Sequence, residues 1–461
     1  MPERTFSREL RVPVSVNVLW AWHERPGAFE RLSPPWDRVR VVERSGGLTD
    51  GSRVVLDVWP GPSPVPTRWV MMHRDYRHGA QFRDVMQSGP FALWDHVHAM
   101  RADGANASVL TDTIRYALPL GALGDTAGGW YAASTLDRVF RYRHAVTAHD
   151  LTRHARVADR GPQRIAITGA SGFIGRALSH FLTTGGHTVL RIGRGRVEPG
   201  NVDITWDPAR GVLDPRALDG VDAVIHLAGA SVAERWSGAH RRAILDSRVQ
   251  GTALLARTLA QLEQKPRVLL SGSAIGIYGD RGDEVLTEDS THGTGYLVDV
   301  ARAWESATAP AEAAGIRTVH LRTGIVLGAA GGALAKQLPI YRLGGGGPIA
   351  GGAFWQSAIA LDDEIGAIHH ALFTESLRGP VNLVGPAPVT QAEFARTLGT
   401  VLSRPAIAPV PRFALELLFG AEMTREVLTS SQRVVPARLL ASGFTFGHAT
   451  LEAMLRFELG R

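Results

Sequence analysis

Three glycines, Gly169, Gly172 and Gly175, have the spacing of a turn that binds phosphate, and they follow the apolar run Arg164–Thr168 and open a helical pattern. Gly169 permits a tight turn, Gly172 lets the backbone approach a pyrophosphate, and Gly175 lets helix and strand pack closely. Free N–H groups and the positive dipole at a helix N-terminus attract the phosphate charge. Tight strand-to-helix turns also use glycine for structure alone. The strand before these glycines and the helix after them favour a nucleotide site.

The end of the next predicted strand indicates which nucleotide is preferred. Enzymes that use NAD place an acid there for the ribose hydroxyls, whereas enzymes that use NADP place an arginine for the 2′-phosphate. Here the first acid is Glu198, after three arginines. We predict that Arg194 binds the phosphate, with Gly193 giving it room and Arg191 or Arg196 assisting, because guanidinium binds phosphate in a bidentate fork. The alternative is that these are solvated arginines in an arginine-rich chain. The pattern favours NADP over NAD.

Composition excludes several kinds of site. The chain has 461 residues, a net charge of +6 and no cysteine, so disulfides, zinc–thiolate sites, cysteine-ligated iron–sulfur clusters and a cysteine nucleophile are excluded. Its basic residues are spread out, which argues against a nucleic-acid partner. No apolar run reaches the roughly 20 residues of a membrane helix. The first ten residues lack an apolar signal core, so we expect a cytoplasmic protein.

The chain divides near residues 155–163, at the helix-breaking pair Gly161 and Pro162. Seven of the eleven tryptophans lie before residue 150. The first part is predicted to be α+β, with two short helices at 15–22 and 26–32, a long helix at 128–148, and strands at 6–14, 38–44, 52–59, 67–76, 80–88, 92–99 and 107–116.

From residue 163 onward, strand and helix patterns alternate, which predicts an α/β doubly wound parallel sheet covered on both faces. One long helical stretch is expected at 296–314, between strands at 267–271 and 317–322. We therefore predict three domains: 1–155, a nucleotide-binding domain at 163–405, and a small helical C-terminal subdomain at 406–461.

The second part resembles the short-chain dehydrogenase/reductase superfamily, in its extended, epimerase-like branch. The resemblance rests on the Gly-x-x-Gly-x-x-Gly spacing and on Asp222–Gly229, Leu270–Gly279 and Leu321–Gly328, which look like its fourth, fifth and sixth strands. It is closer still to an atypical epimerase-family subgroup that binds NADP and has its own C-terminal domain. The resemblance implies that the cofactor is lined by Gly169, Ser171, Gly172, Phe173, Ile174, Gly175, Gly193, Arg194, Leu227, Ala228, Gly229, Arg248 and Ile325.

The first part resembles the START-like, or SRPBCC, superfamily of hydrophobic-ligand binders, which has the helix-grip fold. The resemblance rests on element order and on the segments Val14–Trp20, Gly89–Phe91 and Trp94–His98, together with Trp36. In that fold a curved sheet and a long helix enclose a cavity. The resemblance implies a hydrophobic ligand. The alternative, a core filled by tryptophan side chains, remains open.

The catalytic residues of the superfamily are only partly present. Its hydride-transferring members use a Tyr-x-x-x-Lys pair, in which lysine lowers the pKa of tyrosine from about 10. Tyr296 occupies the tyrosine position, but Val300 replaces the lysine. Tyr296 is therefore either a proton donor or a wall residue. Ser273 matches the serine that orients a substrate oxygen, with Ser271 as the competing assignment, and Tyr278 could reach the nicotinamide side.

Other polar residues have structural interpretations. Glu305, nine residues after Tyr296, should face the opposite side of the helix and pair with an arginine or lie at the surface. His226 lies in a buried strand run and reads as a core histidine with satisfied hydrogen bonds. The pair His96 and His98 shares a strand face, but a metal site would need a third ligand. The run Asp362–Glu364 reads as a helix cap.

These features predict an oxidoreductase or epimerase-like enzyme that uses NADP and acts on a small, apolar carbonyl or hydroxyl substrate. The alternative is a non-catalytic NADP(H)-binding sensor or ligand-binding protein, which the missing Tyr-x-x-x-Lys pair favours. A nucleotide-sugar epimerase ranks below both, because it too needs that pair.

Overall fold

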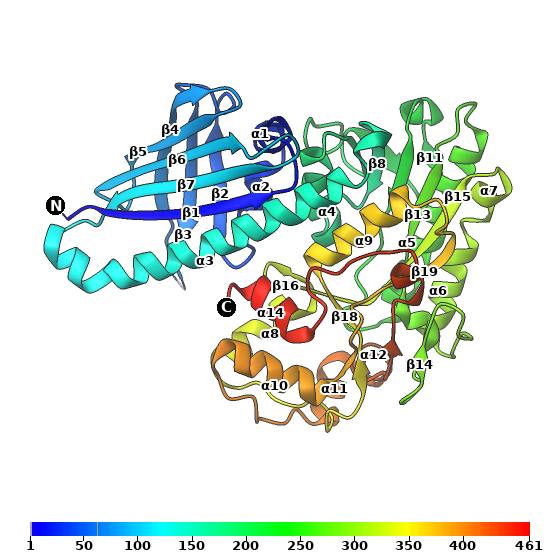
Figure 1. The fold of residues 1–461 in the computed structure, drawn as a ribbon. Helices are drawn as coiled ribbons and strands as arrows, with labels where there is room; N and C mark the ends of the chain where they lie inside the picture. The colour runs from blue at the N-terminus through cyan, green and yellow to red at the C-terminus, as the bar shows by residue number, and fades with distance from the viewer. Residues whose placement is uncertain (1, 62) are drawn as a thin grey trace. The chain divides into compact units, whose positions relative to one another are not determined.

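The computed structural model describes residues 2–61 and 63–461, which form two compact units (Figure 1). The first unit takes the residues up to 161 together with 180–186 and 460. The second takes 162–179, 187–459 and 461. Residues 406–459 thus fall within the second unit, and the division into three domains stays a prediction. Among the described residues, the structure contains no helix with the length and apolar character needed to span a membrane.

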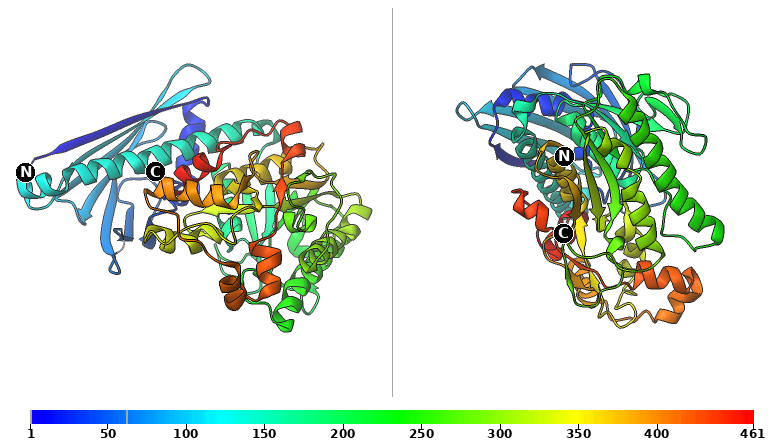
Figure 2. Two further views of the ribbon diagram at one scale, coloured as in Figure 1. Left: turned by 90° about the horizontal axis from the view of Figure 1, so that it is seen from below. Right: turned by 90° about the vertical axis from the view of Figure 1, so that its right-hand side faces the viewer.

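The first unit is a seven-stranded antiparallel sheet with the strand order β1-β7-β6-β5-β4-β3-β2 and one long helix along it (Figure 2). Two short helices lie between the first two strands in sequence. The strands are β1 (Arg4–Val12), β2 (Arg38–Arg44), β3 (Arg53–Trp59), β4 (Thr67–Arg77), β5 (Gln81–Ser88), β6 (Leu93–Ala102) and β7 (Ser108–Ala117), and the helices are α1 (Val16–Glu24), α2 (Ala28–Leu32) and α3 (Gly121–Ala155).

Helix α3 is longer than the predicted helix at 128–148, because its first turns run through glycines that the helix pattern does not favour. Its apolar residues Leu136 and Phe140 pack against Ile114 of β7. At the other end of the sheet, Trp20 and Trp22 of α1 are fully buried. These two tryptophans belong to one of two apolar clusters in the first unit.

The second unit is built on an eight-stranded sheet with the order β11-β10-β9-β8-β12-β13-β15-β19, in which only the β10–β11 pair is antiparallel. The strands of this sheet are β8 (Arg164–Thr168), β9 (Thr188–Gly193), β10 (Ile204–Asp207), β11 (Val212–Leu213), β12 (Ala223–His226), β13 (Val268–Ala274), β15 (Arg317–Thr323) and β19 (Gly379–Leu383). Strand β12 is buried throughout and its neighbours β8 and β13 along most of their length, as their apolar runs predict. This is the expected α/β fold.

Helices cover both faces of that sheet, with α5, α6 and α7 on one face and α9 on the other (Figure 1). The predicted helix at 296–314 is two helices, because Pro310 lacks an N–H and is accommodated in the first turn of α7. The helices are α4 (Phe173–Thr184), α5 (Gly238–Gln261), α6 (Tyr296–Ser306), α7 (Ala309–Ala313), α8 (Gly332–Arg342), α9 (Leu361–Phe373), α10 (Gln391–Leu402), α11 (Arg412–Phe419), α12 (Ala421–Met423), α13 (Ala437–Ala441) and α14 (Leu451–Leu459).

Three short strand pairs attach the later segments of the second unit. Strand β14 (Val285–Leu286) pairs with β21 (Arg433–Val434), β16 (Ile325–Gly328) with β18 (Ala358–Ala360), and β17 (Trp355–Gln356) with β20 (Val389–Thr390). Helices α8, α10 and α14 share an apolar core that contains Leu338, Leu398 and Leu455. The C-terminal residues are thus integrated into the second unit.

Candidate functional site: a glycine turn and a buried polar cluster

The three glycines form the turn between β8 and α4. Gly169 has a φ of +72°, and a Cβ there would lie 2.8 Å from the carbonyl carbon of Leu227 and 2.9 Å from the nitrogen of Ala228. A Cβ on Gly175 would collide with the backbone of the same turn. The turn is therefore seated against the end of β12, and α4 begins directly after it at Phe173. This arrangement presents the N-terminus of α4 at the carboxyl edge of the sheet, where phosphates bind in such folds.

A chain of hydrogen bonds links the residue before the turn to β12 and α5. The hydroxyl of Thr168 accepts from the backbone N–H groups of Leu227 and Ala228, so it donates to Nδ1 of His226 at 2.6 Å. Nε2 of His226 then donates to the hydroxyl of Thr252 at 2.9 Å. His226 is fully buried, and burial lowers its pKa to about 4. His226 is thus the neutral core histidine that its strand pattern indicates.

The end of β9 presents arginines to solvent. Arg194 and Arg196 are exposed, while a Cβ on Gly193 would lie 2.7 Å from a methyl group of Val202. Arg191 is engaged elsewhere, because it donates from its side chain and its backbone N–H to the carboxylate of Asp203. The structure therefore leaves Arg194 and Arg196 as the two arginines available to a ligand at this strand end.

Arg248, on α5, lies behind the loop that follows β12. It donates to the carbonyl oxygens of Ala230 at 3.0 Å and Ile244 at 3.1 Å, and its guanidinium stacks 4.9 Å from the ring centre of Trp304. Burial lowers its pKa to about 10, which still leaves it cationic at neutral pH. Arg248 is thus a half-buried cation that two carbonyl oxygens hold close to Gly229. Its charge suits an anionic or carbonyl-bearing ligand at this edge of the sheet.

Of the remaining residues expected at the cofactor, Phe173 lies with its ring against the turn after β16, so a Cβ on Gly331 would collide with it. Ile325 begins β16, and Ser171 is exposed within the glycine turn. The structure thus brings the turn, residues 227–229 and Arg248 together, and it places Phe173 between the turn and β16.

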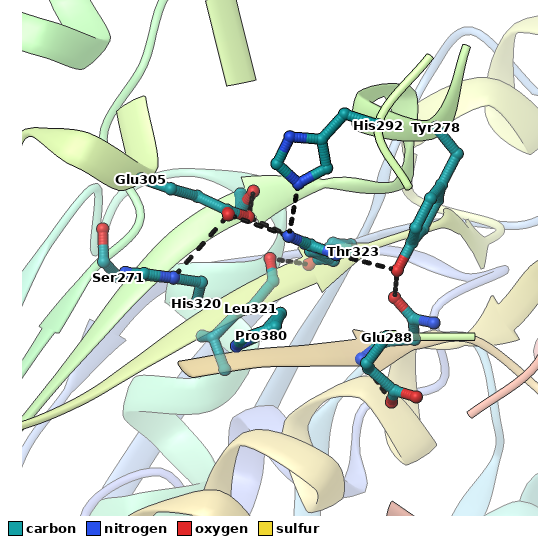
Figure 3. Close-up of polar contacts among 12 residues, drawn as sticks. Ser271, Tyr278, Glu288, His292, Glu305, His320, Leu321, Thr323 and Pro380 are labelled. Atoms are coloured by element: carbon teal, nitrogen blue, oxygen red, sulfur yellow. Dashed lines mark hydrogen bonds and ion pairs between the residues drawn. The ribbon is translucent and has the colours of Figure 1, made fainter. Parts of the chain in front are cut away.

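A buried polar cluster lies at the carboxyl ends of β13, β15 and β19 (Figure 3). Ser273, Arg322 and Asn382 are direct partners in the register of these three parallel strands. Ser273 donates to Oε1 of Glu305 at 2.7 Å. Arg322 binds both oxygens of Glu305, at 2.8 and 2.9 Å. Burial would raise the pKa of Glu305, but the Arg322 guanidinium outweighs it and holds that pKa below its usual value. Glu305 is therefore ionised.

Tyr278 belongs to the same cluster but is fully buried. Its hydroxyl donates to Asn382 at 2.8 Å and accepts from Arg322 at 3.0 Å, and burial raises its pKa. Glu288 completes this side of the cluster by accepting from the backbone N–H of Asn382 at 3.0 Å. Tyr278 thus sits in the core beneath the site.

Tyr296 lies apart from Ser273, at the start of α6. Its hydroxyl donates to the carbonyl oxygen of Arg241 at 2.5 Å, and its ring lies between Trp236 and the Arg241 guanidinium. Burial raises the pKa of Tyr296 more than Arg241 lowers it. Glu426 accepts from the first N–H groups of α6, those of Tyr296 and Leu297, at 3.2 and 2.8 Å. In this arrangement Tyr296 has neither the lysine nor the lowered pKa of a proton donor.

Several residues of the cluster were not found by sequence reasoning. Glu305 was expected to pair with an arginine or to lie at the surface, and its bond to Ser273 was not anticipated. Arg322 and Asn382 join the cluster because they are partners on neighbouring strands. A single sequence does not reveal which residues of two strands are partners. His292 accepts from Arg322 at 3.3 Å, and His320 lies 3.7 Å from Glu305 (Figure 3).

The run Asp362–Glu364 is buried at the first turn of α9, and its members differ in role. Asp363 accepts from the backbone N–H groups of Gly447 and His448. Glu364 accepts from the hydroxyl of Thr323 at 2.9 Å, and burial raises its pKa to about 8. The simple helix-cap interpretation of these three acids is therefore incomplete.

A surface hollow of about 520 Å³ lies in the second unit, between the loop before β17 and the start of α11. Its lining is Ala350, Gly351, Ala353, Phe354, Pro411, Arg412 and Thr429. The lining combines apolar side chains with one arginine and one hydroxyl.

The fold and the glycine turn define a Rossmann-type nucleotide-binding protein, and comparison with known proteins agrees. The sequence profile of the NAD dependent epimerase/dehydratase family matches residues 165–342, and a profile described as a domain of unknown function (DUF1731) matches residues 410–458. An epimerase family protein of Mycobacterium bovis is 41% identical over 298 residues, which are 64% of this chain and 98% of that protein. The chain therefore belongs to the epimerase family.

Two solved structures extend the comparison. The human epimerase family protein SDR39U1 (isoform 2), solved with NADPH, has a TM-score of 0.58 and 32% identity over 64% of this chain and 99% of its own. A nucleoside-diphosphate sugar epimerase from Corynebacterium glutamicum has a TM-score of 0.80 and 32% identity, and the match covers 99% of this chain and 90% of that one. The match to the second structure thus includes the sheet-rich first unit.

Proposed function

We propose that this protein binds NADP(H) and exchanges hydride with the carbonyl or carbinol carbon of a small molecule. The observation that carries the proposal is the glycine turn seated against Leu227 and Ala228, with α4 starting at Phe173. The human relative solved with NADPH supports the same cofactor. When bound, NADPH supplies the hydride.

The preference for NADP rests on the end of β9. Arg194 is exposed directly after Gly193, whereas Arg191 already binds Asp203. A free guanidinium at this position suits the 2′-phosphate, since it can form two charge-assisted hydrogen bonds. Arg248 would contact the cofactor from the opposite side of the turn, where carbonyl oxygens now hold it.

Ser273 is proposed to hold the oxygen of the substrate. Its single hydroxyl hydrogen is donated to Glu305, so its lone pairs remain to accept from a substrate hydroxyl. Arg322 keeps Glu305 ionised and in place, which fixes the orientation of the serine. Glu305 and Arg322 are thus positioning residues, and Tyr278 supports them from the core.

A non-catalytic NADP(H) sensor is the second candidate, and one observation favours it. Val300 replaces the expected lysine, and the Tyr296 hydroxyl is donated to a backbone carbonyl. A tyrosine with a raised pKa is a poor proton donor near neutrality. In a sensor, the cofactor would bind without turnover.

The START-like assignment of the first unit also remains a proposal. It is supported by the order of elements: a strand, two short helices, six further strands and a long helix. Two observations argue against the hydrophobic ligand expected with it: Trp20 and Trp22 are buried in the core, and polar and charged side chains are buried on the sheet. Binding of an apolar fluorescent probe by the full chain would support that ligand; no binding would remove it.

Calorimetric titration with NADPH and NADH tests the cofactor proposal. We expect tight NADPH binding, and a loss of about 10- to 100-fold in Arg194→Ala, which removes one charge-assisted contact. Binding of NADH should change little. The control is Arg210→Ala, because this arginine is exposed and lies in the same unit. Equal affinity for both nucleotides, unchanged in Arg194→Ala, would overturn the NADP preference.

Turnover is tested by following NADP⁺ reduction with a panel of small primary and secondary alcohols, because Ser273 can accept a hydrogen bond from a substrate hydroxyl. If the protein is an enzyme, Ser273→Ala should lower kcat by about 100-fold or more while NADPH binding is kept. Tyr296→Phe distinguishes a proton donor from a residue that only lines the site. Loss of the hydroxyl should lower kcat only if Tyr296 is the proton donor. NADPH binding without turnover of any member of the panel would favour the sensor.

A further inference from the structure

The first unit contains a second polar cluster, which the proposed function does not use. It is built by strand register, like the cluster around Arg322. His73 of β4, Asp84 of β5 and His96 of β6 are direct partners across three antiparallel strands. His98 of β6 is the partner of Asp112 of β7. All of these side chains are buried except that of Asp84, which is 21% exposed.

Three of these side chains converge on one point. Nε2 of His98 lies 3.3 Å from Oδ2 of Asp84, and Nδ1 of His96 lies 4.0 Å from the same oxygen. One ligand atom from each of the three residues lies within 4.8 Å of the other two. Around a tetrahedral ion with bonds of about 2.0–2.1 Å, ligand atoms are roughly 3.3–3.4 Å apart. The three side chains would therefore need shifts of less than about 1 Å.

The opposite ring nitrogens of both histidines face another carboxylate. Nε2 of His96 is hydrogen-bonded to Oδ1 of Asp112 at 3.0 Å, and Nδ1 of His98 lies 2.7 Å from that oxygen. Nε2 of His144, on α3, reaches the other oxygen of Asp112 at 2.7 Å. A carboxylate behind each histidine fixes the ring and its tautomer, and this is the usual arrangement behind histidines that bind metals.

The protonation of the two histidines agrees with this geometry. Because Nε2 of His96 donates to Asp112, its Nδ1 presents a lone pair on the side of Asp84. His98 lies between two carboxylates, with Nε2 on the side of Asp84 and Nδ1 on the side of Asp112.

The carboxylate of Asp84 is itself held in position. Nδ1 of His73 must donate to the carbonyl oxygen of Gly47, at 2.9 Å, and its Nε2 lies 2.8 Å from Oδ1 of Asp84. Each ring nitrogen of His73 thus lies close to one oxygen atom, and the ring backs the Asp84 carboxylate. This leaves Oδ2 of Asp84 directed towards His98 and His96.

We propose that Asp84, His96 and His98 bind a divalent transition-metal ion of the Zn²⁺, Co²⁺ or Fe²⁺ class. Two imidazoles and one carboxylate with open positions are a ligand set that these ions prefer, while Ca²⁺ and Mg²⁺ prefer oxygen. Asp112 is a positioning residue that acts through both histidines. The partly exposed edge of Asp84 gives the ion a way in.

The test uses the full chain, stripped with a chelator and then titrated with Co²⁺ and, separately, Zn²⁺. We expect one Co²⁺ per chain with visible absorption bands of an ion bound by nitrogen and oxygen, and competition by Zn²⁺. Asp84→Asn and His96→Gln should each lower the affinity by about 100-fold or more. Asp112→Asn, which acts behind the ligands, should lower it by about 10- to 100-fold. His78→Gln is the matched control, because this histidine of the same unit is 74% exposed.

Folding of the variants is checked by thermal unfolding without metal, and Asp84→Asn is included because it is nearly isosteric. A second readout is stabilisation, since the ion should raise the unfolding midpoint of the native chain and the His78→Gln variant but not that of Asp84→Asn. The proposal is overturned if the stripped native chain binds no Co²⁺. It is also overturned if folded Asp84→Asn and His96→Gln bind Co²⁺ as the native chain does.

Discussion

Each unit contains a polar cluster that removes carboxylates from water, around Arg322 in the second unit and around Asp112 in the first. The two clusters balance the negative charge of those carboxylates differently. In the second unit a permanent cation, Arg322, binds both oxygens of Glu305. In the first unit, three histidines surround Asp112. Arginine stays charged at all physiological pH values, whereas histidine is charged only when it holds a second proton. The charge balance of the first kind of cluster is therefore fixed, whereas that of the second depends on the protons its histidines hold.

Neighbouring residues of β15 show the same contrast on a smaller scale. Arg322 reaches Glu305, while the next residue, Thr323, donates to Glu364. Successive residues of a strand point to opposite faces, so the two glutamates occupy different environments. Beside a guanidinium, the pKa of Glu305 falls; without a cation beside it, the pKa of buried Glu364 rises to about 8. The presence of one cation thus decides the charge of a buried acid.

The largest expected effect comes from removing the permanent cation. Arg322→Met leaves Glu305 buried beside an apolar side chain and should lower the free energy of unfolding by about 3–5 kcal/mol. Urea denaturation measures the loss. Arg456→Met is the control, because its pair with Glu452 is exposed and should contribute about 0–1 kcal/mol. If Arg322→Met costs no more than the control, the cluster is not held by this charge pair.

Stability should depend on pH through Glu364. Its pKa of about 8 in the folded protein exceeds the ordinary 4.5, so the native state holds a proton that the unfolded state releases between these values. The contribution of Glu364 to the free energy of unfolding is therefore full below pH 4.5 and is lost as the pH rises to 8, at about 1.4 kcal/mol per pH unit. Thermal unfolding at several pH values checks this. In Glu364→Gln that part of the fall should be absent, and an unchanged profile would contradict the assignment.

A steric change at the nucleotide turn should have a smaller effect on stability. Gly169→Ala places a Cβ 2.8 Å from Leu227 at a φ of +72°, and it should cost about 1–3 kcal/mol together with nucleotide affinity. A Cβ on Gly172 would lie 3.1 Å from the carbonyl oxygen of Gly169, and Gly172 does not have the positive φ angle that strains other residues. Gly172→Ala should thus lower nucleotide affinity with little loss of stability. Denaturation and NADPH titration of both variants separate the two roles.

The smallest expected effect on the free energy of unfolding comes from Glu426, whose charge faces the N-terminus of a helix and not a charged side chain. Glu426→Gln keeps a hydrogen-bond acceptor at the first N–H groups of α6 but removes the negative charge there. The loss should be about 0.3–1 kcal/mol, and salt should reduce it. Thermal unfolding at low and high salt measures it. A loss as large as that of Arg322→Met would mean that Glu426 acts as an ion-pair partner.

The sequence predicted the elements better than it predicted the clusters. Strands such as 38–44 were found because their apolar and β-branched residues are local signals, and the glycine turn was found because its spacing is local too. Arg322, Asn382, Asp84 and Asp112 were missed as cluster members because strand register joins residues that are far apart in the chain. His96 and His98 were noticed from their alternation, but Asp84, the third member of the proposed metal site, comes from the neighbouring strand.

The carboxylate of Glu426 sets an order of events during synthesis of the chain. It binds the first N–H groups of α6 across 130 residues of sequence. Strand β21 likewise pairs with β14 only after residue 434 has been made. Domains begin to fold from the N-terminus while the ribosome is still at work. The sheet and long helix of residues 4–155 can therefore fold while the helix that carries Tyr296 still waits, uncapped, for residue 426 to be made.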